Sequence, residues 1–501
     1  MDTKALRQKI LDLAIRGKLV PQDPNDEPAS VLLERIRAEK QQMVKDGKLK
    51  PKDIKNDTVI FKGDDNLHYE QYADGTVKCI EDEIPFDVPD NWEWCRLQTI
   101  CTKEIKRGKA PKYEEKSSVI VFAQKCNTKS GFIDISKAKF LAQNTLKKYA
   151  DEDFLYYNDI IINSTGTGTL GRVGIYKKED DIYSIKIVPD SHITTVRTIP
   201  SEINAQYIYY FLKFNQLYFE NSGVGSTNQK ELKPEVISTF LIAIPPLNEQ
   251  NAIIDKVNMV NKHLSNLDNE KEQLKELISS TKSKILDLAI RGKLVPQDPN
   301  DEPASVLLER IRAEKEELIK QGKIKRDKKE SVIFKGDDNS YYEKYGEKLP
   351  KGWVVTNFET LLSYEQPTNY IVKDTNYKNE YKTPVLTAGK SFILGYTNEK
   401  DNIFSELPVI IFDDFTTESK FVNFPFKVKS SAMKILHINT DFVLPKFVYY
   451  LMQATEIDHE NHQRYWISTY SQEIVGLPPI SEQKRILSTL EYYFDLLDKL
   501  I

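Results

Sequence analysis

The sequence has few cysteines and no long apolar run. Only four of its 501 residues are cysteine, at positions 79, 95, 101 and 126, with no CxxC pair and no metal-ligand spacing to the six histidines. This argues against a disulfide framework or a metal site and favours reduced thiols. No run of 18 apolar residues occurs and the start, MDTKALRQKI, is charged, so we expect neither a membrane span nor a signal peptide. The expected location is the cytoplasm.

The sequence also lacks a strong net charge. Its 71 Lys and Arg against 75 Asp and Glu give −4, so nothing global indicates nucleic-acid binding, and any such role must depend on local patches. A hydrophobic content of 40% is enough for packed cores. The length predicts about three domains at roughly 150 residues each.

Motifs of catalysis are missing as well. There is no Walker A lysine, and the IPPL and LPPI segments lack the residues that flank the Pro-Pro pair in the adenine methyltransferase tetrad. Each Pro-Pro pair instead precedes a predicted helix, with Asn248 or Ser481 placed to cap it and Glu249 or Glu482 in its first turn. We therefore expect no catalytic activity and no cofactor in this chain.

What the sequence does contain is an internal repeat. Residues 9–40, KILDLAIRGKLVPQDPNDEPASVLLERIRAEK, recur without change at 284–315. Three further pairs follow in the same order: TVIFKGDDNLHYEQY (58–72) with SVIFKGDDNSYYEKY (331–345), VPDNWEW around Trp92 with LPKGWVV around Trp353, and IPPLNEQ (244–250) with LPPISEQ (477–483). The chain is thus two copies of one unit, in which similar arms flank two divergent inserts.

The arms have the periodicity of a coiled coil. From Val257 to Leu288, apolar positions alternate in steps of four and three, with Lys271 as the one charged exception, and Gly292 and Pro296 end the pattern. Shifted by 233 and by 275 residues, the same seam falls at the C-terminus and at the N-terminus. The long helix, of about 44 residues or roughly 66 Å, is therefore continuous in the middle of the chain, and its second copy is split between the two ends. We predict that residues 1–17 and 480–501 meet in space.

In these repeats the chain resembles the specificity subunits of type I restriction-modification systems. The resemblance covers the whole chain and is carried by the repeated KILDLAIRGKLVPQDPNDEPASVLLERI and VIFKGDDN, the PPLNEQ and PPISEQ helix starts, and the PxxW openings at Pro89–Trp92 and Pro350–Trp353. It implies two target recognition domains, each reading one half of an asymmetric bipartite DNA site. It also implies that the repeated helices set the spacer and dock two methyltransferase subunits.

The expected fold is mixed α/β (α+β): two globular recognition domains separated by an antiparallel coiled-coil pair of long helices, in a pseudo-twofold, circular organisation. The expected parts are an N-terminal arm (1–83), a first recognition domain (84–246), a central region (247–346), a second recognition domain (347–479) and a C-terminal half-helix (480–501). Restriction and translocase subunits are further implied partners, with S-adenosylmethionine, ATP and Mg in the partner subunits rather than in this chain.

Residues 164–174, STGTGTLGRVG, satisfy the GxGxxG pattern of a dinucleotide site. The segment that follows alternates like a strand and opens no helix, so a pyrophosphate would find no helix N-terminus. We interpret the segment as a hairpin that approaches DNA, and a purely structural hairpin stays open as the alternative.

Polar, basic and aromatic clusters in the inserts are the expected DNA contacts. In the first insert these are Lys106, Arg107, Lys109, Lys112, Thr165, Thr167, Thr169, Arg172, Ser226, Thr227, Asn228, Gln229 and Lys230. In the second they are Lys390, Thr416, Thr417, Lys420, Arg464, Tyr465, Trp466, Ser468 and Tyr470. Two other functions remain open: an enzyme that binds a nucleotide at the glycine loop, and a coiled-coil scaffold that never meets DNA.

Overall fold

The computed structural model describes residues 2–129, 132–166, 168–181, 185–225, 230–322, 349–389, 391–438, 443–455 and 465–500. The chain divides into two compact units, Met1–Asn269 and Glu270–Ile501, called unit 1 and unit 2 below. Both contain helices and sheets, so the predicted mixed α+β content is confirmed. Among the described residues, no helix is long and apolar enough to span a membrane.

Two four-stranded sheets form the insert of unit 1, and inner strands such as IIIN and VIVF are short, rich in β-branched residues and buried on both faces. Their orders are β10-β9-β12-β5 and β11-β7-β8-β6, and all pairs are antiparallel except β11 with β7. The strands are β5 (Lys106–Arg107), β6 (Tyr113–Glu114), β7 (Val119–Phe122), β8 (Lys139–Leu141), β9 (Ile160–Asn163), β10 (Val173–Ile175), β11 (Lys186–Pro189) and β12 (Ile193–Val196).

The remaining elements of unit 1 connect this insert to the arm. Strands β1 (Val59–Lys62), β2 (His68–Gln71) and β3 (Val77–Cys79) form an antiparallel sheet from the first VIFKGDDN copy and the residues after it. The second copy lies outside the described residues. Strand β4 (Glu93–Arg96) pairs with β13 (Leu241–Ile244), so the start and end of the insert lie side by side. The helices are α1 (Thr3–Ile15), α2 (Ala29–Lys45), α3 (Ala205–Phe214), α4 (Gln216–Asn221), α5 (Pro234–Ser238) and α6 (Leu247–Ile290).

Unit 2 has the same general plan with a different insert. Strand β14 (Val354–Asn357) pairs with β22 (Ile474–Leu477) as β4 does with β13. The insert holds a four-stranded sheet, β15-β21-β18-β19, and a three-stranded sheet, β17-β16-β20. Its strands are β15 (Leu362–Glu365), β16 (Thr383–Leu386), β17 (Ile393–Thr397), β18 (Val409–Asp413), β19 (Ser419–Val422), β20 (Lys427–Val428) and β21 (Met433–Ile438), and the helices are α7 (Ala304–Lys320), α9 (Phe358–Leu361), α10 (Pro445–Gln453), α11 (Tyr465–Ser468) and α12 (Ile480–Asp498).

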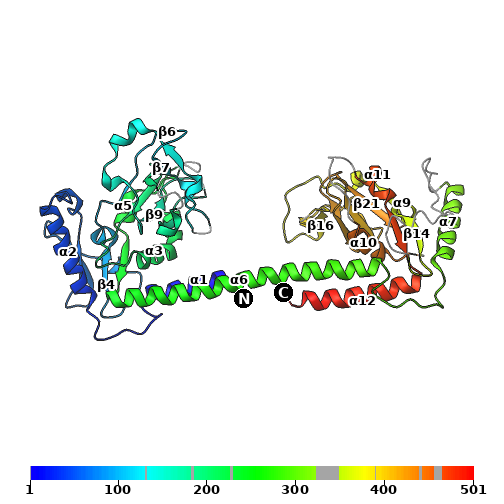
Figure 1. Cartoon of the computed structure of the whole chain (residues 1–501), viewed down its shortest axis with the longest axis horizontal. Coiled ribbons are helices and arrows are strands. Elements are labelled where there is room, and N and C mark those ends of the chain that lie inside the picture. The colour runs from blue at the N-terminus through cyan, green and yellow to red at the C-terminus, as the bar shows by residue number, and fades with distance from the viewer. Residues whose placement is uncertain are drawn as a thin grey trace. The chain divides into compact units, whose positions relative to one another are not determined.

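The long helix α6 has 44 residues and is contacted by a terminal helix within each unit. In unit 1, α1 lies antiparallel along it (Figure 1): Thr3 and Arg7 bond Asp268, whereas Ile15 shares a core with Ile253. In unit 2, α12 does the same, because Lys282 pairs with Asp498 at 2.6 Å and Leu490 shares a core with Leu286. These contacts supply the packing that the short terminal helices need.

The predicted seam of α6 has the burial of a helix-packing face. Val257, Leu264 and Ile278 are buried, and the other apolar seam positions are half-buried. Lys271 is exposed, in keeping with its charge. The helix ends at Ile290, two residues before Gly292, whose φ of +63° favours glycine. The predicted stop at Gly292 is confirmed.

Candidate nucleic-acid interface

Each arm joins its insert through a buried Trp–Glu–Gln junction. In unit 1, Trp92 donates its Nε1–H to Glu249 Oε2 at 2.9 Å, and Gln22 donates to Glu249 Oε1 at 2.9 Å. In unit 2 the matching bonds are 3.0 and 3.1 Å long, from Trp353 and Gln297 to Glu482. The junction therefore connects the PxxW opening, the turn after the arm helix and the helix after the Pro-Pro pair.

The two junction carboxylates are almost inaccessible, with 3% exposure for Glu249 and 1% for Glu482. Burial raises the pKa of both groups above the usual value, and the hydrogen bonds from the Gln and Trp side chains partly oppose this. The sequence placed both residues in the first helical turn, which is confirmed, but it did not predict their tryptophan partners.

The predicted caps of these two helices are wrong. Asn248 lies inside α6 and donates to Asp26 at 2.8 Å. The residue before α12 is Pro479, and no side chain caps it. The next residue matters more, because Gln250 Oε1 accepts from Asn204 N at 2.9 Å and Gln483 Oε1 accepts from Leu444 N at 3.0 Å. Each such glutamine attaches its arm helix to a helix of the insert.

The predicted basic loop of the first insert is largely neutralised within the fold. Arg107 pairs with Glu231 at 2.5 Å and donates to the Leu232 carbonyl at 2.9 Å. Lys109 pairs with Asp153 at 2.5 Å, and Lys106 with Glu152 at 3.4 Å. Lys112 is exposed. Since acidic partners far apart in sequence offset most of the loop's positive charge, its predicted surplus for phosphate contact is smaller than the segment suggests.

The glycine-rich segment is a hairpin between β9 and β10, as predicted, and a strand rather than a helix follows it. Arg172 donates to the carbonyls of Asn127 at 2.7 Å and Gly168 at 3.0 Å, so its guanidinium holds the loop in shape. Thr169 bonds the Thr165 carbonyl at 3.1 Å. Thr167 lies outside the described residues. In the described part of this segment no helix begins after the glycines, so it offers no helix N-terminus to a pyrophosphate.

Described residues on either side of the predicted 226–230 cluster lie beside the glycine hairpin. Thr165 and Val224 both form bridges with Glu231, and Leu232 N donates to Ser164 O at 2.8 Å. Residues 224 and 231–232 are thus close to the hairpin, and Arg107 reaches the same place through Glu231. Lys230 is exposed, whereas Ser226, Thr227, Asn228 and Gln229 lie outside the described residues.

In the second insert, the prediction that the aromatic cluster contacts DNA at the surface is wrong. Tyr465, Trp466 and Tyr470 are 2%, 3% and 1% exposed. Trp466 and Tyr470 pack against Phe412 in the core, and buried Asp414 accepts from the backbone N–H of Trp466 at 3.0 Å. An aromatic segment next to a cation has the same composition whether it covers a core or faces DNA. Lys390, Arg464 and the side chain of Ser468 lie outside the described part of the chain.

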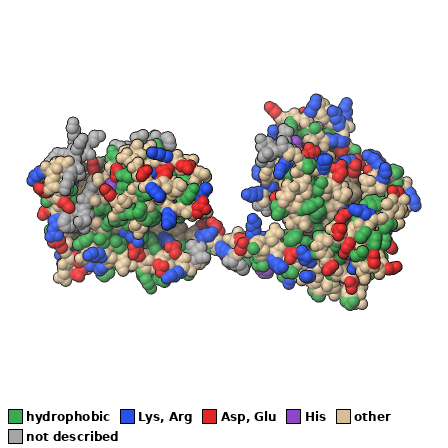
Figure 2. All heavy atoms as spheres, turned by 180° about the vertical axis from the view of Figure 1, so that it is seen from behind, with side chains coloured by type: hydrophobic (Ala, Val, Ile, Leu, Met, Phe, Trp, Pro, Cys, Tyr) green, Lys and Arg blue, Asp and Glu red, His purple; other side chains and the backbone are tan. Residues whose placement is uncertain are grey.

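The tip of the β18–β19 hairpin remains a surface candidate. Thr416 is exposed, and Thr417 has a left-handed φ of +59°. Asp413 Oδ1 accepts from the backbone N–H groups of Phe415 and Thr416, at 2.9 and 3.0 Å, which fixes the turn. Lys420 lies 3.6 Å from Glu418. On the face in Figure 2, acidic and basic side chains are interspersed, in line with the small net charge.

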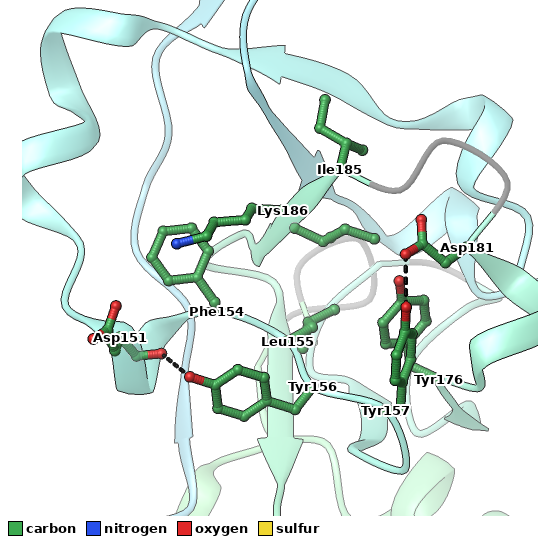
Figure 3. A pocket seen from close by; sticks show the side chains of 10 residues that line it. Asp151, Phe154, Leu155, Tyr156, Tyr157, Tyr176, Asp181, Ile185 and Lys186 are labelled. Atoms are coloured by element: carbon green, nitrogen blue, oxygen red, sulfur yellow. Dashed lines mark hydrogen bonds between the residues drawn. The ribbon is translucent and has the colours of Figure 1, made fainter.

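A pocket in the first insert offers no nucleotide site of the glycine-loop type. It has a volume of about 350 Å³, and its lining includes four aromatic residues, Phe154, Tyr156, Tyr157 and Tyr176 (Figure 3). Its one basic group, Lys186, lies over the Phe154 ring at 4.9 Å. No residue of the glycine hairpin lines this pocket. The pocket and the GxGxxG pattern are therefore separate features.

Comparisons with known proteins give a consistent set of similarities. A family model described as the type I restriction modification DNA specificity domain matches residues 89–277. The EcoAI specificity subunit of Escherichia coli is 30% identical over 462 residues, covering 82% of this chain and 70% of that protein. The EcoEI specificity subunit of the same organism is 31% identical over 402 residues, 70% of this chain, and the chain spans only 60% of its length. A solved structure from work on assembly of the type I R-M system covers 83% of this chain and 93% of its own at 14% identity, with a TM-score of 0.47, too low to support an argument.

Proposed function

The chain belongs to the family of type I restriction-modification DNA specificity subunits, and on this premise we propose that it reads a bipartite DNA site for such a complex. The insert of unit 1 reads one half of the site and the insert of unit 2 reads the other. The observation that carries this proposal is the repeated Trp–Glu–Gln junction, which attaches two different inserts to matching arms.

In the proposed assembly, α6 and the two terminal helices form an antiparallel pair that separates the readers. Residues 1–17 and 480–501 meet end to end, so the organisation is circular. Two readers related by such symmetry meet their half-sites in opposite orientation, and the helix length sets the spacer. Because the inserts differ, the site is asymmetric.

The arms are the proposed docking surface for two methyltransferase subunits. Two copies of one partner require two matching surfaces, and the unchanged block at 9–40 and 284–315 meets this requirement. The exposed faces of the helices also carry apolar side chains at equivalent positions, Met259 at 44% exposure and Tyr492 at 61%. Such residues on a helix suit a helical partner.

We further propose that this chain contributes no chemistry. S-adenosylmethionine, ATP and Mg belong to the methyltransferase subunits and to the restriction or translocase subunits. The glycine hairpin supports this division, since a strand follows it. Equilibrium dialysis of the lone chain against S-adenosylmethionine, ATP and NAD tests the division, and tight binding of any of them would contradict it.

The proposed DNA function is tested by selection from a randomised duplex pool. The chain, assembled with its modification subunits, is expected to enrich duplexes with two unequal half-sites at a fixed separation. Enrichment of a single contiguous site, or of no sequence, would overturn the proposal. The modification subunits without this chain serve as the control.

A further inference from the structure

Three loops meet at one end of the insert of unit 1. Gln124 follows β7, Thr165 follows β9, and His192 stands between β11 and β12. Strands β7 and β11 are parallel, so both end at the same edge, and Asn163 at the end of β9 pairs with Ile193. The strand order therefore brings together three polar side chains that are far apart in sequence.

The three side chains form one chain of hydrogen bonds. Gln124 Nε2 donates to Thr165 Oγ1, and this hydroxyl lies 2.7 Å from His192 Nδ1. Because an amide nitrogen can only donate, the Thr165 hydroxyl accepts from Gln124, and its own hydrogen remains available for His192 Nδ1. In the tautomer of His192 whose Nδ1 accepts that hydrogen, the ring proton is on Nε2, and the ring is exposed.

Gln124 keeps one amide hydrogen and its carbonyl oxygen for a ligand. Its Nε2 has a second hydrogen, and its Oε1 accepts no bond from the described residues. The amide lies close against Gly166, where a Cβ would come within 2.7 Å of Oε1 and where φ is +99°. The glycine hairpin thus holds the amide in place without covering it.

We propose that Gln124 and His192 read base edges in the half-site of unit 1, with Gln124 on an adenine and Thr165 as the positioning residue. An amide with one free donor and one free acceptor matches N7 and N6 of adenine in the major groove. His192 Nε2–H is a donor for an adjacent acceptor, such as guanine O6 or thymine O4. This inference rests on the proposed function and names the residues that carry it in unit 1.

The surroundings suit a base-reading site better than a purely structural link. Lys125, Lys129 and Lys230 are exposed on the same group of loops, and the nearby Glu231 is paired with Arg107. Lysines beside the site supply phosphate contacts that fix the orientation on DNA. A hydrogen-bond chain that only connected the loops would not require an exposed imidazole or an amide with an unused N–H and oxygen.

The test is selection from a randomised duplex pool by the assembled complex, with variants of Gln124, Thr165 and His192. Gln124→Ala is expected to lower discrimination at one adenine about ten- to a hundred-fold and to leave the other half-site unchanged. Gln124→Glu removes the donor and is expected to move that position toward cytosine, whose amino group a carboxylate accepts. Thr165→Val is expected to relax the same position, and Thr165→Ser to restore it.

Gln143→Ala is the matched control. Gln143 is another glutamine of this insert whose side chain bonds Ser117 and Ser118, and it follows β8 at the opposite end of β7 from Gln124. Its variant is expected to select the wild-type sequence. Thermal midpoints equal to the wild type show that every variant is folded.

The outcomes separate this inference from the proposed function. A wild-type bipartite site that Gln124→Ala and His192→Ala leave unchanged would overturn the inference and leave the proposed function in place. A relaxed position in the half-site of unit 1 alone supports it. A wild-type complex that selects no sequence would overturn both.

Discussion

Replacing Glu249 with alanine removes the acceptor that Trp92 and Gln22 share. The Trp92 indole is 3% exposed, so its N–H is left buried without a partner, which costs about 1–3 kcal/mol. Loss of the hydrogen bond from Gln22 adds about 1 kcal/mol. Removing the buried carboxylate also removes its desolvation cost, which offsets part of the destabilisation. We expect a net loss of about 1–3 kcal/mol of folding free energy.

The repeat provides a second, independent measurement of the same quantity. Glu482→Ala removes the same two bonds from Trp353 and Gln297 in unit 2, so both variants should lose stability to a similar extent. For units of this size, the loss corresponds to a fall of roughly 2–12 °C in the midpoint of the affected unit. Calorimetry, together with hydrogen exchange of the peptides that contain Trp92 and Trp353, assigns each fall to its unit.

Glu27→Ala and Glu302→Ala are the matched controls. These glutamates pair with Arg35 and Arg310 on the surface of the arms, at 2.6 and 2.7 Å, with about half of each carboxylate exposed. Exposed pairs contribute little, so both controls should remain near the wild-type midpoint. If the junction variants fell no further than the controls, the junction would not hold arm to insert, and a fall in only one unit would refute its equivalence in the two units.

Gly17→Ala and Gly292→Ala should each destabilise the fold by at least about 1–2 kcal/mol. The backbone φ is +66° and +63° at these positions, and a Cβ would lie 2.4 Å from Pro89 or Pro350. Calorimetry measures the midpoints, and unchanged midpoints would contradict this prediction. Burial raises the pKa of Asp57, which lies beside Lys40, from 3.8 to about 6. The folded state therefore binds this proton more tightly than the unfolded state. The resulting stabilisation is complete below about pH 4 and is lost as the pH rises to about 6. Relative to Asp57→Asn, the wild type should lose stability between these values in urea titrations, and parallel pH profiles would refute the argument. A photo-crosslinker at Lys4 should capture residues 480–501, and capture of other segments alone would oppose the circular organisation.

Much of the fold of the arms could be predicted, because the internal repeat allows one half of the chain to be compared with the other. The stop of the long helix at Gly292, the first-turn position of Glu249 and the hairpin at the glycine segment all follow from local patterns. Local patterns suffice where backbone conformation and helix periodicity decide the structure.

The candidate contacts were less predictable, because pairing across the fold decides them. Arg107 reads as a free cation until the strands bring Glu231 to it, and Gln124 gains His192 only through the parallel pairing of β7 with β11. Trp466 was predicted to contact DNA but is buried, since it packs against Phe412, a strand residue more than fifty positions away. Tertiary contacts of this kind leave no periodic signal in the sequence.

The central claim is most directly tested by mapping methylated bases across the genome of cells that carry this chain with its modification subunits. The account predicts one asymmetric motif of two unequal parts at a fixed separation, lost when the gene for this chain is deleted. A map with no motif that depends on the chain, or with only a single-part motif, would contradict it.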